Sequence, residues 1–167
     1  KKGTPVIVGT GDSTAEAISV GLVESGTVFF QYGSSMFYYY CVDRYVDDYV
    51  SANGNGSLKG GKEFTIPGTF CIGDGTNAAG TLTRWVRDTF YEEELKKERA
   101  GGENAYAVMA REAAEVEAGS EGLIILPYIY GERSPIQDAK ASGMLFGLKG
   151  THTRKQINRA ALEAVGY

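Results

Sequence analysis

The apolar residues change their spacing at Asn77, and this change divides the chain into a β-rich part and a helix-rich part. Before it, the β-branched and aromatic runs Thr27 to Phe30 and Phe37 to Val42 predict a hairpin with a glycine at its tip. Another strand is predicted from Glu63 to Ile72, and Pro67-Gly68 inside it suggests a sheet edge or a bulge. From Asn77 onwards, apolar residues recur every three or four positions, as in an amphipathic helix.

The remaining segments complete a mixed α/β domain that we expect to span residues 1–167 as a single unit. The amino-terminal part reads as strand, turn and helix, at 6–8, 9–11 and 15–23. The carboxy-terminal part is predicted to contain a helix from 77 that ends in the charged run 92–99, a helix at 103–116, a strand buried on both faces at 122–130, a short strand at 143–148 and a helix at 151–165.

Composition and charge exclude several classes of protein. The chain has 167 residues, of which 43% are hydrophobic and 23% charged, which fits a globular domain and excludes a disordered or fibrous chain. The net charge is −4 without a basic run, so nucleic acid is not an expected partner. Cys41 and Cys71 lie far apart and His152 is the only histidine, so no metal site is predicted. No stretch has the length of a membrane span, and we expect a cytoplasmic protein.

Asp12 stands where the first predicted strand meets the first helix, a place where a carboxylate can face a cleft. An aspartate there can also be a helix N-cap. Ser13 is followed three residues later by Glu16, which is a capping-box pair, and this pair would leave the Asp12 carboxylate free to point outward. The positive end of a helix favours an ionised carboxylate, which can accept a proton.

Three further segments could meet a phosphate or serve only as structure. Gly33-Ser34-Ser35 offers amides and hydroxyls to an anion, or is an ordinary hairpin turn. Gly80 opens the helix that carries Trp85, where amides could meet phosphate oxygens, or it allows a tight connection from strand to helix. Arg133 could approach a phosphate, or it could pair with Glu132 or Asp138 and hold its loop.

The order and spacing of these segments resemble the FGGY carbohydrate kinases along essentially the whole chain. Gly143-Met144-Leu145-Phe146-Gly147-Leu148, followed after seven residues by Gln156-Ile157 and after two more by Ala160-Ala161-Leu162-Glu163, is similar to the carboxy-terminal signature of that family. Gly11-Asp12 resembles the glycine and aspartate at the entry to the helix between the two lobes. Gly33-Ser34 resembles the phosphate turn of the family, with serine in place of threonine.

Two more segments extend the resemblance. The stretch from Gly80 to Asp88 is similar to the glycine-initiated helix of the family, and Gly131-Glu132-Arg133-Ser134-Pro135 resembles a loop that lines the region between the lobes. The resemblance implies that Asp12 is the catalytic base and that it and Ser13 contact the sugar. It also implies that Gly33, Ser34, Ser35, Gly80 and Arg84 contact ATP, while Glu132 and Arg133 lie near the cleft.

For the fold, the resemblance implies a ribonuclease-H-like lobe of the actin and hexokinase type, with a mixed sheet and flanking helices. Residues 1–24 would form the interlobe strand and helix, and residues 25–167 the lobe core. The Asp-x-Gly-Thr motif with its magnesium-associated aspartate, and the Gly-Gly-Gly adenine motif, do not occur in the sequence. The lobe is therefore expected to be incomplete.

The implied activity is transfer of the γ-phosphoryl group of MgATP to a sugar or polyol, with a pentulose such as xylulose expected. The chain alone is expected to be inactive, to require an amino-terminal lobe as partner and to be capable of self-association. Two rivals are an actin-like ATPase, in which Asp12 would position water, and a scaffold that has lost catalysis; Asp12 together with the loop at Gly131 favours the kinase.

Overall fold

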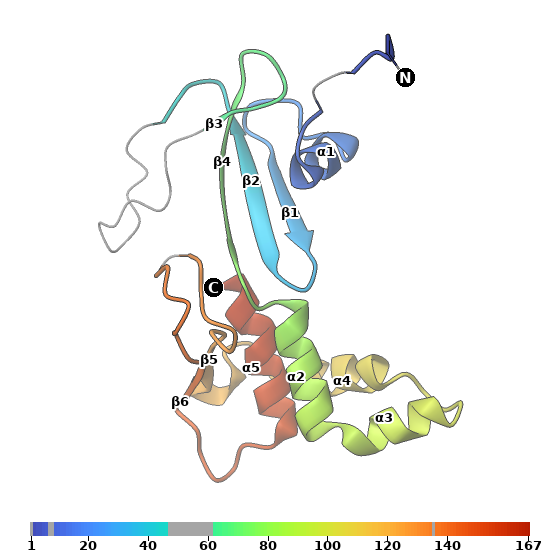
Figure 1. The fold of residues 1–167 in the computed structure, drawn as a ribbon. Helices are drawn as coiled ribbons and strands as arrows, with labels where there is room; N and C mark the ends of the chain where they lie inside the picture. Colours follow the sequence, from blue (N-terminus) through green and yellow to red (C-terminus); the bar gives the residue numbers. More distant parts are fainter. Residues whose placement is uncertain (1, 7–8, 47–61, 135) are drawn as a thin grey trace. The chain divides into compact units, whose positions relative to one another are not determined.

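The fold of the chain is given by a computed structural model that describes residues 2–6, 9–46, 62–134 and 136–167 (Figure 1). The strand predicted at 6–8 falls largely outside the described residues. Contacts group the chain into two compact units, one of Lys1–Gln31 with Phe37–Asp74 and the other of Tyr32–Met36 with Gly75–Tyr167. Each unit is described by itself.

The first unit combines one helix with most of a four-stranded sheet. The helix is α1 (Asp12–Ser19), and the strand order is β1-β2-β4-β3, with bounds Val28–Tyr32, Met36–Val42, Phe70–Thr76 and Lys62–Glu63. The predicted hairpin is confirmed as β1 and β2, whose three-residue connection makes them antiparallel. Ala17, Leu22, Cys41 and Phe64 form its buried core, so Cys41 is a core residue with a free thiol.

The single strand predicted from Glu63 to Ile72 is wrong, because the chain reverses at Pro67-Gly68. Proline fixes its own φ and Gly68 adopts a φ of +78°, a pair of conformations typical of a tight turn. The amide of Thr69 donates to the carbonyl of Ile66 at 3.1 Å and closes this turn. The result is a short edge strand, β3, that pairs antiparallel with β4.

The second unit is helical, with a two-stranded sheet beside the helices. Its elements are α2 (Gly80–Phe90), α3 (Glu92–Arg99), α4 (Ala105–Ala114), the short 3-10 turn η1 (Ser120–Gly122), β5 (Ile124–Leu126), β6 (Met144–Phe146) and α5 (Arg154–Gly166). Helices α2 and α5 lie side by side, and α4 and β5 also pack against α5 (Figure 1). The core between them is apolar and includes Leu82, Val86, Tyr91, Met109, Leu123, Ile125, Ala160 and Ala161.

The continuous helix predicted through the charged run is also wrong, because it breaks at Tyr91. This residue adopts φ −128° and ψ 33°, which ends α2 and begins α3, and its ring is completely buried. The predicted strand at 122–130 is likewise reduced to the three residues of β5. Pro127 has no amide for a ladder, and Ile124 remains 46% exposed, so this strand is not buried on both faces.

Arg154 joins four helices of the second unit through one guanidinium group. It donates two hydrogen bonds of 3.1 Å to the carboxylate of Glu94 and two, of 2.6 and 3.0 Å, to that of Glu112. A longer bond of 3.4 Å reaches the carbonyl of Phe90, and the guanidinium stacks 4.2 Å from the centre of the Tyr91 ring. The hydroxyl of Tyr91 donates to Glu112 in turn, at 2.8 Å. Arg154 therefore links α2, α3 and α4 to the start of α5.

This network shifts the pKa values of its members. Hydrogen bonds from Arg154 hold the pKa of the Glu94 carboxyl below its usual range. Burial pushes the pKa of Glu112 upward, but bonds from Arg154 and Tyr91 outweigh it and lower that pKa overall. Burial, with the Glu112 carboxylate as acceptor, raises the pKa of the Tyr91 hydroxyl.

We predict that Arg154→Met destabilises the chain by about 3 kcal/mol at pH 7, because it leaves two partly buried carboxylates without their cation. The matched control is Arg111→Met, which removes an equivalent Arg–Glu pair with Glu103 that is more than half exposed, and should destabilise the chain far less. The free energy of unfolding of both variants is measured by urea denaturation.

The difference between wild type and Arg154→Met should also depend on pH. The carboxyls of Glu94 and Glu112 have lowered pKa values in the folded chain, so their contribution is present above the unfolded value, about 4.3, and is lost as pH falls through the folded values. The difference should therefore shrink below about pH 4. A difference that stays constant from pH 7 to pH 3 would contradict the role given to the ion pairs.

Candidate functional site

The tip of the β1–β2 hairpin is joined to the start of α2 by backbone hydrogen bonds. The amide of Gly80 donates to the carbonyl of Gly33 at 3.0 Å, and the amides of Ala79 and Thr81 both donate to the carbonyl of Ser34 at 3.1 Å. The hydroxyl of Thr81 donates to the same carbonyl at 3.0 Å. The first amides of α2, which lack partners within the helix, are thus satisfied by the turn.

Gly80 is required at this contact for a steric reason. A Cβ atom added at this position would lie 2.7 Å from the carbonyl oxygen of Gly33, a distance that real Cβ atoms essentially never show. Because the obstacle is backbone, it cannot move aside without displacing the turn. The structure therefore brings Gly33, Ser34 and Gly80 together, as an anion site at this place requires.

The side chains around this contact are available to a ligand. Ser34 is exposed, and its hydroxyl has no hydrogen-bond partner among the described residues. Ser35 is half-buried, and its carbonyl accepts from the Gly33 amide at 2.9 Å, which closes the turn. Arg84 is exposed on α2, four residues after Gly80 and so on the same face of the helix; its guanidinium forms no salt bridge within the described part of the chain.

Glu132 holds the loop after β5 against the residues that precede α2. Its side chain is only 2% exposed and accepts three hydrogen bonds, from the Thr76 hydroxyl at 2.6 Å, the Asn77 amide at 2.9 Å and the Arg133 amide at 2.7 Å. The Glu132 amide donates to the carbonyl of Asp138 at 2.9 Å. A buried carboxylate with three donors is well solvated by the protein, so this residue has a structural role next to the segment that leads into α2.

Arg133 does not form the ion pair with Glu132 or Asp138 that the sequence left open as its structural alternative. Its side chain is exposed, and within the described residues its guanidinium pairs with neither Glu132 nor Asp138. The reason is that Glu132 faces inward and is already satisfied by amides and a hydroxyl.

Asp12 and Ser13 belong to the first unit, where Asp12 is the first residue of α1. The predicted capping box is wrong: the N-cap is Gly11, and no side chain among the described residues caps the helix. Instead, Asp12 Oδ1 accepts the amide of Ser13 at 2.8 Å, and Glu16 accepts from Gln31. The Asp12 side chain is exposed, so one carboxylate oxygen, Oδ2, remains open to a ligand.

Tyr39, on β2, lies beside this start of α1 and was not predicted as a site residue. Burial raises the pKa of its hydroxyl, the hydroxyls of Ser13 and Thr14 lower it, and the charge of Asp12 raises it. A tyrosine within reach of all three is visible only in the folded chain, since three consecutive tyrosines in a strand do not indicate which one faces the helix.

Residues 31–167 match the FGGY family of carbohydrate kinases, C-terminal domain. The chain is 30% identical to a gluconokinase from Bacillus subtilis over 98% of its own length, and 32% identical to a xylulose kinase from Lactococcus lactis over 97%. A solved xylulose kinase structure from Rhodospirillum rubrum superimposes with a TM-score of 0.73 over 92% of the chain, at 30% identity.

The chain therefore belongs to the FGGY family of carbohydrate kinases, and the predicted fold class is confirmed. It spans about a third of the length of the curated relatives it matches, 31% of the gluconokinase and 29% of the xylulose kinase. Among the described residues, no helix is long and apolar enough to cross a membrane.

We predict that Glu132→Ala lowers the free energy of unfolding by more than about 2 kcal/mol, because three donors lose their acceptor in a buried place. Glu132→Gln is the matched variant. Its amide oxygen can still accept from Asn77 and Arg133, and the Thr76 hydroxyl can turn and accept from its NH₂ group. Urea unfolding should give a smaller loss for glutamine than for alanine; equal losses would show that the hydrogen bonds do not stabilise this loop.

Replacing Gly80 should disturb the hairpin tip even though alanine is the better helix former. Gly80→Ala is predicted to cost about 1–3 kcal/mol and to speed hydrogen exchange of the Thr81 amide, because the added methyl displaces the turn. The control is Gly150→Ala, where the added Cβ meets nothing within 4 Å, and it should change stability by less than about 0.5 kcal/mol. Unchanged exchange at Thr81 in Gly80→Ala would contradict the contact.

Proposed function

We propose that this chain is the lobe core of a carbohydrate kinase that transfers the γ-phosphoryl group of ATP to a sugar or polyol hydroxyl. The observation that carries the proposal is the close approach of the Gly33-Ser34 turn to Gly80 at the start of α2, which places exposed hydroxyl and cationic side chains at one end of a helix. Family membership supports the reaction class, and both gluconate and xylulose kinases occur among the relatives.

The phosphates of ATP would meet side chains rather than the first amides of α2, because these amides already donate to the turn. Ser34 and Ser35 supply hydroxyls, and Gly33 keeps the turn narrow. Arg84 supplies the positive charge: long side chains on a helix lean towards its amino-terminal end, so the guanidinium can reach back to Gly80 and the turn. The nearby end of the helix dipole adds a favourable potential for an anion.

Mg²⁺ would neutralise charge on the phosphates when bound. Within the described residues, no group of three or more His, Cys, Asp or Glu side chains could hold a metal ion. The phosphate oxygens of ATP would supply part of its ligands, and the proposal gives no residue of this chain that role.

Asp12 is the general base of the proposed reaction. Oδ2 accepts the proton of the sugar hydroxyl while the hydroxyl oxygen forms a bond to the γ-phosphorus, and the bond from that phosphorus to the β–γ bridging oxygen breaks to leave ADP. Ser13 orients the carboxylate, because its amide holds Oδ1. General-base assistance of this kind contributes about 10²- to 10⁴-fold to the rate.

Within the complete kinase, residues 1–24 would form the strand and helix between the lobes, and residues 25–167 the core of this lobe. An amino-terminal lobe would be the partner and would supply most sugar contacts. Xylulose is the proposed acceptor. Asp12 and the turn at Ser34 belong to different units.

We predict that Asp12→Asn, in a protein that carries this chain together with an amino-terminal lobe, lowers kcat by about 10²- to 10⁴-fold. The KM for ATP should change little, because the amide keeps the shape of the side chain and lies outside the phosphate site. Asp43→Asn, a second exposed aspartate of the same unit, is the control and should keep parental turnover.

The measurement is coupled ADP release with xylulose, ribulose, glycerol and gluconate. In the same assay the 167-residue chain alone should release no sugar-dependent ADP, because orientation of both substrates supplies most of the rate. Parental turnover by Asp12→Asn, or sugar-dependent ADP release by the chain alone, would contradict the proposal.

A further inference from the structure

The sheet of the first unit carries both cysteines of the chain, on neighbouring strands. Cys41 lies on β2 and Cys71 on β4, and both are thiols in this structure. Cys41 is completely buried in the core cluster that contains Ala17 of α1, and Cys71 packs against the same cluster. Both side chains therefore lie on the face of the sheet that carries α1.

The two strands run in opposite directions. The carbonyls of the Gly33-Ser34 turn, just before β2, accept hydrogen bonds from the amides of Ala79 and Gly80, which follow β4. The start of β2 and the end of β4 therefore lie at the same end of the sheet, and Figure 1 shows β4 running back along β2 towards α2. Neighbouring strands of opposite direction form an antiparallel ladder.

The register of this ladder follows from a contact at Gly73. A Cβ atom added there would lie 2.3 Å from Tyr39 Cδ1 and 2.8 Å from the carbonyl oxygen of Tyr38, so Gly73 lies opposite Tyr39. In an antiparallel pair, a step of two residues forward on one strand matches a step of two backward on the other, which places Cys41 opposite Cys71. The same register pairs the seven residues of β2 with the seven of β4 from end to end.

The backbone of Cys41 bonds on the β1 side and not on the side of β4. Its amide donates to the carbonyl of Thr27 and its carbonyl accepts from the amide of Gly26, both at 2.9 Å. Cys41 and Cys71 are therefore a non-hydrogen-bonded pair, in which the Cα atoms of an antiparallel ladder lie about 4.5 Å apart. Disulfides join residues whose Cα atoms are about 4.4–6.8 Å apart, so the strands already hold the two thiols at a suitable separation.

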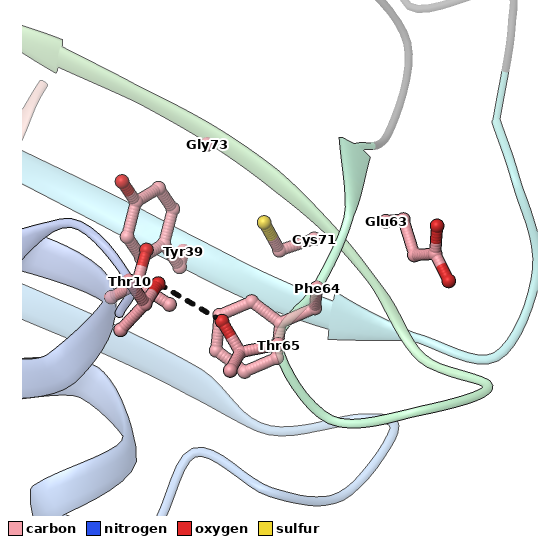
Figure 2. A pocket seen from close by; sticks show the side chains of 8 residues that line it. Thr10, Tyr39, Glu63, Phe64, Thr65, Cys71 and Gly73 are labelled. Carbon is pink, nitrogen blue, oxygen red and sulfur yellow. Dashed lines mark hydrogen bonds between the residues drawn. The ribbon is translucent and has the colours of Figure 1, made fainter. Parts of the chain in front are cut away.

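Cys71 is the thiol that a reagent can reach. It lines a pocket of about 230 Å³ together with Thr10 and Tyr39, and Figure 2 shows its sulfur on the same side of the sheet as the Tyr39 ring. A water molecule takes about 30 Å³ in the liquid, so the pocket admits a molecule of the size of hydrogen peroxide. Cys41 is 0% exposed, so attack on the pair begins at Cys71.

We propose that Cys41 and Cys71 form a reversible disulfide when the chain meets a peroxide. The thiolate of Cys71 attacks one peroxide oxygen, and the O–O bond breaks to leave a sulfenic acid on Cys71 and a hydroxide. The thiolate of Cys41 then attacks the sulfenic sulfur; the S–S bond forms as the S–O bond breaks, and a second hydroxide leaves. The two hydroxides take up the two thiol protons, so two thiols and one peroxide give one disulfide and two waters.

The cross-link joins β2 to β4, so the sheet that carries α1 can no longer open between them. A thiol reductant restores both cysteines by exchange. Because only the sheet is involved, the disulfide does not depend on the proposed phosphoryl transfer.

The test is treatment of the 167-residue chain with hydrogen peroxide, followed by alkylation of the remaining thiols and mass spectrometry. The wild-type monomer should lose two hydrogen atoms and resist alkylation, and a thiol reductant should restore both thiols. Cys41→Ala should stop at the sulfenic acid of Cys71, which dimedone traps. Cys71→Ser should leave a buried Cys41 thiol that is oxidised at least about tenfold more slowly than Cys71.

The matched control moves the thiol by one residue, with Cys71→Ser and Ile72→Cys in the same chain. Positions 71 and 72 are both partly buried, but neighbouring residues of a strand face opposite sides of the sheet, so the moved thiol points away from Cys41. This variant should form less than about a tenth of the intramolecular disulfide of the wild type. Melting curves establish that each variant is folded.

The oxidised wild type should also unfold at a higher urea concentration than the reduced protein, because the bond restricts the unfolded chain without displacing the folded strands. Three outcomes would overturn the proposal: oxidation without an intramolecular disulfide, equal cross-linking of the thiol moved to position 72, or an oxidised chain that unfolds at a lower urea concentration than the reduced one.

Discussion

The buried carboxylate of Glu132 joins the loop after β5 to the segment that leads into α2, because its three donors come from these two segments. Thr76 and Asn77 lead into α2, and Arg133 lies in the loop after β5. A carboxylate that is 2% exposed must keep these donors or remain poorly solvated, so the loop and the start of α2 are fixed together. The carbonyls of Gly33 and Ser34, at the tip of the hairpin, then accept hydrogen bonds from the amides at the start of α2. Arg154, at the start of α5, likewise fixes the positions of helices relative to one another, because it binds carboxylates on α3 and α4.

The reaction proposed for this chain depends on two kinds of groups. The backbone contacts just described fix the geometry, and a few exposed side chains are proposed to contact the substrates. The backbone of the turn and the first amides of α2 hold each other, which leaves side chains such as Ser34 and Arg84 for the ligand. Asp12 follows the same rule: one carboxylate oxygen is bound by its own helix and the other is open. In both places the backbone bonds set the geometry, and exposed side-chain groups are the ones proposed to meet the substrate.

Much of the fold could be predicted from the sequence, because local patterns decide it. The hairpin, α2, α4 and α5 follow from β-rich runs and apolar periodicity. One failure has a nonlocal cause, because Tyr91 ends a helix when its ring enters the core. Two others have local causes to which the predictions gave too little weight: a turn at Pro67-Gly68, and Pro127, at which the strand after Gly122 stops. For the candidate site, residue types and the family resemblance singled out the Gly33-Ser34 turn and Gly80, which the structure brings into contact. The partners of Glu132 and Asp12 were not, since a carboxylate in a sequence does not reveal whether it faces inward or binds its own neighbour.

The contact between Gly80 and Gly33 also limits how the chain can vary. The two positions are 47 residues apart in the sequence, yet any side chain at position 80 needs space that the carbonyl of Gly33 occupies. A larger residue at position 80 therefore requires a turn of different length or shape, and a changed turn loses the acceptors of the Ala79 and Thr81 amides. A substitution at position 80 should consequently be inherited together with a change in the turn, and a single change at position 80 should be rare among active descendants of this chain.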